Sequence, residues 1–146
     1  SSTSGVVVQG IDDVLVRFAK CCNPLPGDAI LGFVTRGRGI TVHLASCSRA
    51  IDMDPDRRIE VEWDDHTSIA RPVTVRITTE DRPGLLAEIS QVFTDNKVNI
   101  SQANCRVIGE DRAVNTFEVM IRDKDQLRRV LGKIRGAKGV VSVDRV

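Results

Sequence analysis

The second half of the sequence changes its hydrophobic period in a fixed order, and this order most narrows the folds open to the chain. Val73, Val75 and Ile77 alternate with polar residues, which predicts a strand with one buried face. Apolar residues then recur every three or four positions over 85–93, which predicts an amphipathic helix with Asn96 suited to its C-cap. Further patterns predict a strand over 98–107, a strand around 117–121, a helix over 127–134 and a strand around 141–143.

The predicted order is strand, helix, strand, strand, helix, strand. With right-handed crossovers it gives a ferredoxin-like βαββαβ sandwich, in which two helices cover one face of four antiparallel strands. The second strand changes phase after Ile100, and a bulge near Ser101 would restore it. The opposite face is predicted to be polar, and either open or covered by a partner, with Thr74, Arg76, Gln102, Asn104, Arg106, Thr116, Glu118 and Ser142 on it.

The first part of the chain is a smaller, glycine-rich pattern. Strands are predicted at 14–18, 29–35, 40–43 and 59–63, with two helical turns over 45–51. The prolines and glycine of segment 23–28 exclude regular structure there, and Gly37-Arg38-Gly39 predicts a hairpin turn. We therefore predict an α+β protein: a small α+β module at 1–64, a linker at 65–71 and the βαββαβ domain at 72–146.

Composition and motifs exclude several functional classes. The net charge is only +1, and no Walker loop, HExxH or GxSxG pattern is present, so no catalytic activity is predicted. No apolar run is long enough for a membrane span and the start is not a signal peptide, so we expect a cytoplasmic protein with no membrane partner. The chain begins with Ser1 and not Met, which indicates a piece of a longer protein.

Cys21, Cys22, His43 and Cys47 form a candidate ligand set, since three cysteines and one histidine are a common structural zinc site. Adjacent cysteines in an extended chain point to opposite faces, however, and chelating pairs are usually separated by two or more residues. We therefore predict a cluster of reduced thiols and no cofactor, with zinc as the less favoured alternative. Cys105, alone on a strand, is predicted to be a small buried residue.

Two loops carry candidate binding groups. The loop from Asp81 to Leu86 is either a plain strand-to-helix turn or an anion site, because Gly84 lets a carboxylate approach the N-terminus of a helix. Asn99 would then hold the other end of a small zwitterion. Arg36 and Arg38 flank Gly37 at the hairpin tip, where they either grip phosphates or form a solvated loop.

Several motifs together resemble one family. Cys21-Cys22-Asn23-Pro24-Leu25-Pro26-Gly27-Asp28, Thr35-Arg36-Gly37-Arg38-Gly39 and the His43 to Cys47 segment closely resemble the ribosome-intersubunit domain, also called the zinc-finger domain, of the RelA/SpoT family. Asp81-Arg82-Pro83-Gly84-Leu85-Leu86 and Asn99-Ile100 resemble the marks of an ACT domain, which is the family's other C-terminal regulatory domain. The resemblance covers about residues 10 to 146.

The resemblance implies a regulatory role. The family makes and hydrolyses guanosine tetra- and pentaphosphate, (p)ppGpp, with catalytic domains that precede this region, so the chain is expected to have no activity of its own. The first module is expected to contact ribosomal RNA through Arg36, Arg38 and His43. The ACT domain is expected to form a homodimer and to bind a branched-chain amino acid, valine or isoleucine, which biases synthesis against hydrolysis. The implied ligand-binding residues are Asp81, Arg82, Gly84, Leu85, Leu86, Asn99, Ile100 and Ser101.

Other interpretations remain open at this point. An RNA-recognition domain shares the βαββαβ order, but it needs exposed aromatic residues on its open face, where none is predicted. The ACT domain could be a dimerisation module without a ligand, or a subunit of an amino-acid metabolic enzyme. A stand-alone zinc adaptor would account for the first module only.

Overall fold

The chain folds into two compact units, Ser1–Ile69 and Ala70–Val146. The computed structural model describes residues 5–8, 14–37, 39–64 and 69–146, so Arg38 and the linker residue His66 lie outside the described residues. The division falls inside the segment predicted as linker, and the limits of the two domains given above stay a prediction. Within the described residues, no helix has the length and apolar character needed to cross a membrane.

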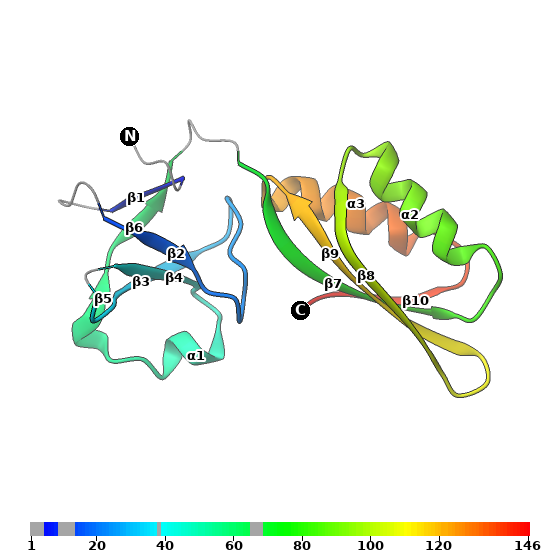
Figure 1. Cartoon of the computed structure of the whole chain (residues 1–146), viewed down its shortest axis with the longest axis horizontal. Coiled ribbons are helices and arrows are strands. Elements are labelled where there is room, and N and C mark those ends of the chain that lie inside the picture. Colours follow the sequence, from blue (N-terminus) through cyan, green and yellow to red (C-terminus); the bar gives the residue numbers. More distant parts are fainter. Residues whose placement is uncertain (1–4, 9–13, 38, 65–68) are drawn as a thin grey trace. The chain divides into compact units, whose positions relative to one another are not determined.

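Two small sheets form the first unit (Figure 1). Strand β1 (Val6–Val8) pairs with β6 (Val61–Trp63). The other sheet has the order β2 (Val16–Phe18), β4 (Ile40–Leu44), β3 (Ile30–Val34) and β5 (Arg58–Ile59), with β2 parallel to β4 and β3 antiparallel to β4 and β5. The predicted hairpin is thus present, while the predicted strand at 59–63 is divided between the two sheets.

The core of the first unit lies between these strands. One buried cluster in it consists of Val6, Val8, Ile40, Val42 and Val61. Trp63 stacks on Phe18, with ring centroids 5.7 Å apart, and its indole nitrogen donates to the Asp28 carbonyl at 2.9 Å. That bond joins the end of β6 to segment 23–28, whose prolines prevent regular secondary structure.

The helices of the first unit are shorter than predicted. Helix α1 (Ser48–Ile51) is a single turn, and a 3₁₀ turn, η1 (Pro55–Arg57), follows it. Ala45 is not helical: its N–H donates to the Ala29 carbonyl at 2.8 Å, next to the last β3–β4 pair, and the residue lies in a turn. The helix begins only after Cys47, whose N–H closes a turn onto Leu44.

The second unit is the predicted βαββαβ sandwich. Its elements are β7 (Arg71–Glu80), α2 (Leu85–Asp95), β8 (Asn99–Ile108), β9 (Arg112–Ile121), α3 (Lys124–Arg135) and β10 (Val140–Arg145). The strand order is β10-β7-β9-β8 with every pair antiparallel, and both helices lie on one face of the sheet (Figure 1). The period changes in the sequence therefore identified every element of this unit.

The helix-facing side of this sheet holds the second core. Phe93 of α2 meets Phe117 of β9, with ring centroids 5.3 Å apart, and both rings are buried. Asn115 is the polar exception on this side: its Nδ2 donates to the Ile77 carbonyl and the Thr79 hydroxyl, both at 3.2 Å. These bonds satisfy an amide that would otherwise be costly to bury.

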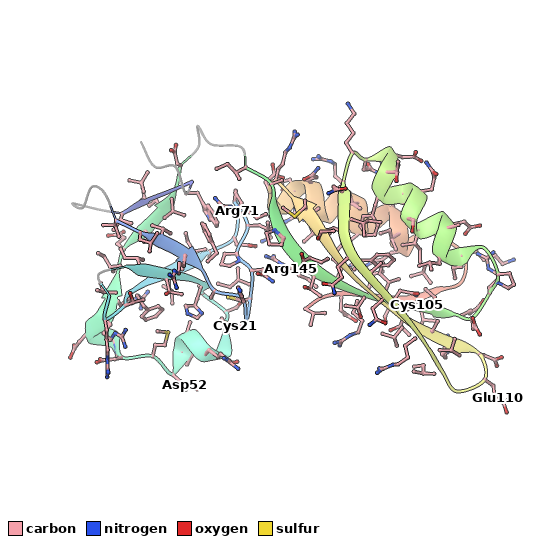
Figure 2. The ribbon with its side chains drawn as sticks, in the orientation of Figure 1. Cys21, Asp52, Arg71, Cys105, Glu110 and Arg145 are labelled. Carbon is pink, nitrogen blue, oxygen red and sulfur yellow. The ribbon has the colours of Figure 1, made fainter. Side chains whose placement is uncertain are left out.

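Strand β8 is the exposed edge of the sheet. Its register shifts between Ile100 and Gln102, so the bulge predicted near Ser101 is confirmed. Cys105 is exposed, and the prediction that it is buried is wrong (Figure 2). Cys105 pairs with Asn115 on the helix-facing side, but the β8–β9 hairpin runs on past the helices, so nothing covers it.

Candidate functional site

The four candidate ligands of the first unit come from three elements. Cys21 and Cys22 lie in the turn that follows β2, His43 lies in β4, and Cys47 precedes α1. Of these four residues, Cys21 is labelled in Figure 2. The N–H groups of Cys22 and Asn23 both donate to the Ala19 carbonyl, at 3.4 and 2.9 Å, and Asn23 has a left-handed φ of 45°. The chain therefore curls at this point and is not extended.

The curl brings all four ligand atoms within 4.8 Å of one another. Cys21 Sγ lies 3.9 Å from Cys22 Sγ, 3.6 Å from Cys47 Sγ and 3.5 Å from His43 Nδ1. Cys22 Sγ lies 3.9 Å from the same nitrogen. The premise that adjacent cysteines diverge here is wrong, because it assumed an extended backbone.

These separations fit a tetrahedral zinc ion. Zn–S bonds of about 2.3 Å and Zn–N bonds of about 2.0 Å place neighbouring ligand atoms about 3.5 to 3.8 Å apart. The four separations above lie between 3.5 and 3.9 Å. The donor set is also one that structural zinc sites use, so the residues present fit this metal.

The thiols differ in acidity when no metal is bound. Burial raises the pKa of Cys22 to about 12, although the Leu44 N–H, 3.3 Å from its sulfur, opposes this. Burial also raises the pKa of Cys47, but hydrogen bonds from His43, from the N–H groups of Ala50 and Arg49 and from Cys21 outweigh it and lower the pKa to about 6. Cys47 is therefore the thiol most ready to ionise, and a metal would have to displace the proton of Cys22.

His43 lies in the cysteine cluster. Its side chain is buried, with 6% of its surface exposed, and its ring meets Phe33 edge-on at 5.8 Å. This burial favours the role in the cluster, and a contact of His43 with RNA stays a prediction.

The hairpin tip between β3 and β4 carries Arg36, which is exposed. Thr35 closes the turn: its N–H donates to the Gly39 carbonyl at 2.8 Å, and its hydroxyl accepts from the Gly39 N–H at 3.2 Å. A groove of about 260 Å³ lies beside the tip, lined by Leu15, Arg17, Thr35, Gly37, Gly39, Ile40 and Thr41. Arg17 was missed in the sequence, where its polar position in the alternation of β2 was the available signal.

The loop before α2 is held by Arg82. Its Nη2 donates to Glu88 Oε2 at 3.0 Å and to the Lys138 carbonyl at 2.9 Å. Gly84 is the N-cap with a φ of 83°, no side chain caps the helix, and a Cβ at Gly84 would meet nothing within 4 Å. Asp81 is exposed and does not cap the helix.

The N–H groups at this helix start are not all available. The Leu85 N–H donates to the Arg82 carbonyl at 3.2 Å, and the Leu85 side chain is buried in the core. Leu86 is exposed. Open space therefore lies next to Gly84 and Leu86, on the solvent side of the loop.

The second half of the expected amino-acid site lies at the other end of the sheet. Glu80, just before the loop, pairs with Arg112, whereas Asn99 pairs with Met120. These two positions on β9 are eight residues apart, or about 27 Å of strand. Within one chain, the loop and Asn99 therefore do not share a site. Nearby, Ile100 is half-buried and the Ser101 hydroxyl donates to Glu118 Oε1 at 2.8 Å.

Two family models match the chain. Residues 6–64 match the RelA/SpoT RIS domain, and residues 68–145 match an ACT domain. Both are regulatory domains, and neither is catalytic.

Relatives match nearly the whole chain. It is 57% identical over 146 residues to a GTP pyrophosphokinase of Myxococcus xanthus, covering 100% of this chain and 19% of that protein. It is 38% identical over 144 residues to the bifunctional (p)ppGpp synthase/hydrolase RelA of Mycobacterium tuberculosis, covering 97% and 20%. The chain thus spans about a fifth of the length of these relatives.

A solved structure also aligns with part of this chain. The ACT domain from the GTP pyrophosphokinase of Chlorobium tepidum aligns with a TM-score of 0.48 and 22% identity, covering 53% of this chain and 99% of that one.

Proposed function

Because this chain belongs to the RelA/SpoT family and carries its RIS and ACT domains, we propose that it is the amino-acid-sensing and ribosome-contacting region of a longer cytoplasmic enzyme that makes and degrades (p)ppGpp. The ACT domain would be the sensor. The RIS domain would be the ribosomal contact.

The observation that carries the sensor is the separation of the two half-sites along one exposed edge strand. In the sheet, Glu80, Arg112 and Ile108 form one row, so the loop lies at the end of β8, while Asn99 lies at its start. If two copies pair their β8 strands antiparallel, the start of one strand lies beside the end of the other. The partner's Asn99 would then approach the loop, and a homodimer would hold two complete sites.

The chemistry of such a site suits an amino acid. The open N-terminus of α2 beside Gly84 favours a carboxylate, because its N–H groups and the positive end of the helix dipole point at it. The amide of the partner's Asn99 and carbonyls of the 99–101 segment would take the ammonium group. Leu86 and the partner's Ile100 offer apolar walls, which favour valine and isoleucine over charged side chains.

Calorimetric titration of the chain with valine, isoleucine, lysine and aspartate tests this. Gly84→Asp puts a negative charge where the carboxylate would lie and should abolish valine binding. Gly84→Asn is the matched control, since it has the same bulk and the same left-handed backbone, which Asn and Asp tolerate better than most residues. The Gly84→Asn variant should retain more affinity for valine than the Gly84→Asp variant. Undiminished valine binding by Gly84→Asp would place the site elsewhere.

Ligand binding can bias the enzyme only if the amino acid binds the synthesising and degrading states with different affinities.

Light scattering distinguishes the dimerisation-only alternative. A dimer that binds none of the four amino acids would support that alternative and overturn the proposal that the ACT domain is an amino-acid sensor. A metabolic-enzyme subunit is disfavoured by the RIS match at 6–64.

The fit of the cysteine cluster favours a second proposal, that the RIS domain binds one zinc ion through Cys21, Cys22, His43 and Cys47. With four protein ligands, zinc would add folding stability and leave no reactive position. It would join the turn after β2 to β4 and to the start of α1. We further propose that Arg36 and Arg38, in the segment between β3 and β4, and Arg17 of β2 contact ribosomal RNA, which the exposure of Arg36 and the groove lined by Arg17 support.

A further inference from the structure

The face of the ACT sheet that the helices leave open carries an ordered set of polar side chains. Along β7 and β9, residues that alternate with the buried ones point to this face, among them Arg76, Val114 and Thr116. Thr116 pairs with Arg76 on one side and with Asn104 on the other, and Val114 pairs with Arg106. Directly paired residues project to the same face, so two arginines, a hydroxyl and an amide surround one point.

A groove of about 580 Å³ occupies this point, lined by Arg76, Asn104, Arg106, Val114 and Thr116. All five residues belong to β7, β8 and β9, whose paired backbones hold their spacing. The volume is in the range of small-molecule sites. The groove lies on the opposite face from α2, so it is separate from the amino-acid site proposed above.

The two guanidinium groups in the groove are available. Among residues 69–146, all of which the structure describes, neither Arg76 nor Arg106 takes part in an ion pair, unlike Arg82 with Glu88. Acidic groups lie at the rim of the groove. Asp144 of β10 is the strand-register partner of Arg76 in β7, without an ion pair between their side chains. Glu118, one row further along β9, accepts from the Ser101 hydroxyl. The groove is therefore positive inside and negative at its margin.

This arrangement selects a compact anion. Guanidinium groups bind phosphate oxygens through paired N–H donors, and a hydroxyl and an amide can donate to the same group. Two arginines projecting from strands on either side of β9 suit two linked phosphoryl groups better than one. An extended polyanion such as RNA would meet Asp144 and Glu118, and the groove has no aromatic ring on which a base could stack.

We propose that this groove is a binding site for a compact diphosphate-bearing ligand, held by Arg76 and Arg106 with Thr116 and Asn104. The ligand is recognised through its phosphoanhydride group. It binds independently of the amino acid.

The test is calorimetric titration of the full chain with inorganic pyrophosphate at constant ionic strength and without divalent metal. Pyrophosphate should bind one equivalent per chain and more tightly than orthophosphate. Arg76→Gln and Arg106→Gln should each weaken it about tenfold or more, because each removes a charge-assisted contact. The matched control is Arg129→Gln, an exposed arginine on α3 at the helix-covered face, which should bind as the parent does.

Asp144→Asn gives a readout in the opposite direction, since removing the rim charge should tighten pyrophosphate binding a few-fold. Titration with GDP then separates two sources of the same group: tighter binding than pyrophosphate indicates a nucleotide, and equal binding indicates the diphosphate alone. The proposal is overturned if pyrophosphate does not bind, if Arg129→Gln weakens it as much as the groove variants, or if a single-stranded oligoribonucleotide binds the groove more tightly than pyrophosphate. Valine binding by the groove variants should stay unchanged, so failure here leaves the sensor proposal standing.

Discussion

The guanidinium of Arg82 is ion-paired with the carboxylate of Glu88, its Nη2 3.0 Å from Oε2, across the first turn of α2. Both side chains are substantially exposed, so this pair contributes little stability, roughly 1 kcal/mol or less. Its position matters more than its energy. Glu88 puts a negative charge beside the helix end that is proposed to receive a carboxylate.

Glu88→Gln should therefore tighten valine binding a few-fold, because it removes the competing charge, while the free energy of unfolding changes by no more than about 1 kcal/mol. Calorimetry and urea unfolding measure the two effects. Glu60→Gln, at an exposed position in the first unit, is the matched control and should leave affinity unchanged. Weaker valine binding by Glu88→Gln would contradict this and would show that the site needs Arg82 held in place by its ion pair with Glu88.

The metal proposal predicts one zinc per chain by elemental analysis. Cys22→Ser and Cys47→Ser each remove a ligand from the cluster and should lose the metal. Cys105→Ser is the matched control because Cys105 is exposed on β8 in the other unit, and it should keep full zinc content. Parent protein purified without zinc, yet fully folded, would argue for reduced thiols alone.

The stability of the metal-free protein should depend on pH in two windows of opposite sign. Cys47 has a pKa lowered from 9.0 to about 6, so its contribution is complete above pH 9 and is lost as pH falls toward 6. Cys22 has a pKa raised from 9.0 to about 12, so its contribution is complete below pH 9 and is lost as pH rises toward 12. The combined contribution of these two thiols should therefore be largest near pH 9.

Urea unfolding after chelation checks this, followed by the fluorescence of Trp63, the chain's one tryptophan, which reports on the first unit through its stacking on Phe18. Cys47→Ser should flatten the rise between pH 6 and 9 and leave the fall above pH 9. An unchanged rise in that variant would assign it to another group.

Ribosome binding should weaken and lose salt dependence when hairpin-tip charges are removed. Each phosphate contact contributes roughly 0.7 to 0.9 to the slope of log affinity against log salt, so Arg17→Ala should lower the slope by about that amount and the Arg36→Ala/Arg38→Ala double variant by about twice as much. Co-sedimentation with ribosomes at several salt concentrations measures it. Arg49→Ala, exposed on α1, should leave the slope as it is.

The sequence predicted the second unit well because its period changes are long and regular, and strand phase assigned even the bulge at Ser101. Phase failed for Cys105, because it tells which face a residue lies on but not how far a helix covers that face. Local backbone conformation was the second failure. The curl after Ala19 depends on a left-handed Asn23, which no periodicity reveals.

The candidate sites were least predictable where they depend on distant parts of the chain. The contact between Arg82 and the Lys138 carbonyl joins segments 56 residues apart, and no local pattern points to it. Asn99 follows α2 closely in sequence, yet α2 returns the chain to the far end of the sheet, so proximity in sequence does not show that Asn99 and the loop before α2 lie far apart within one chain.

Asn115 gives the sheet a means of alignment that its apolar residues lack. Val73 and Val75 face Val119 and Phe117, and the apolar residues of both strands would bury nearly as well after a slip of two residues, since such a slip keeps every side chain on its own face. A slip that sets Asn115 opposite Val75 would take its amide away from the Thr79 hydroxyl, at a cost of about 1 to 3 kcal/mol for an unmatched buried donor. One amide thus opposes a slip in this direction, and part of the alignment of β7 with β9 is encoded in a polar contact within an apolar layer.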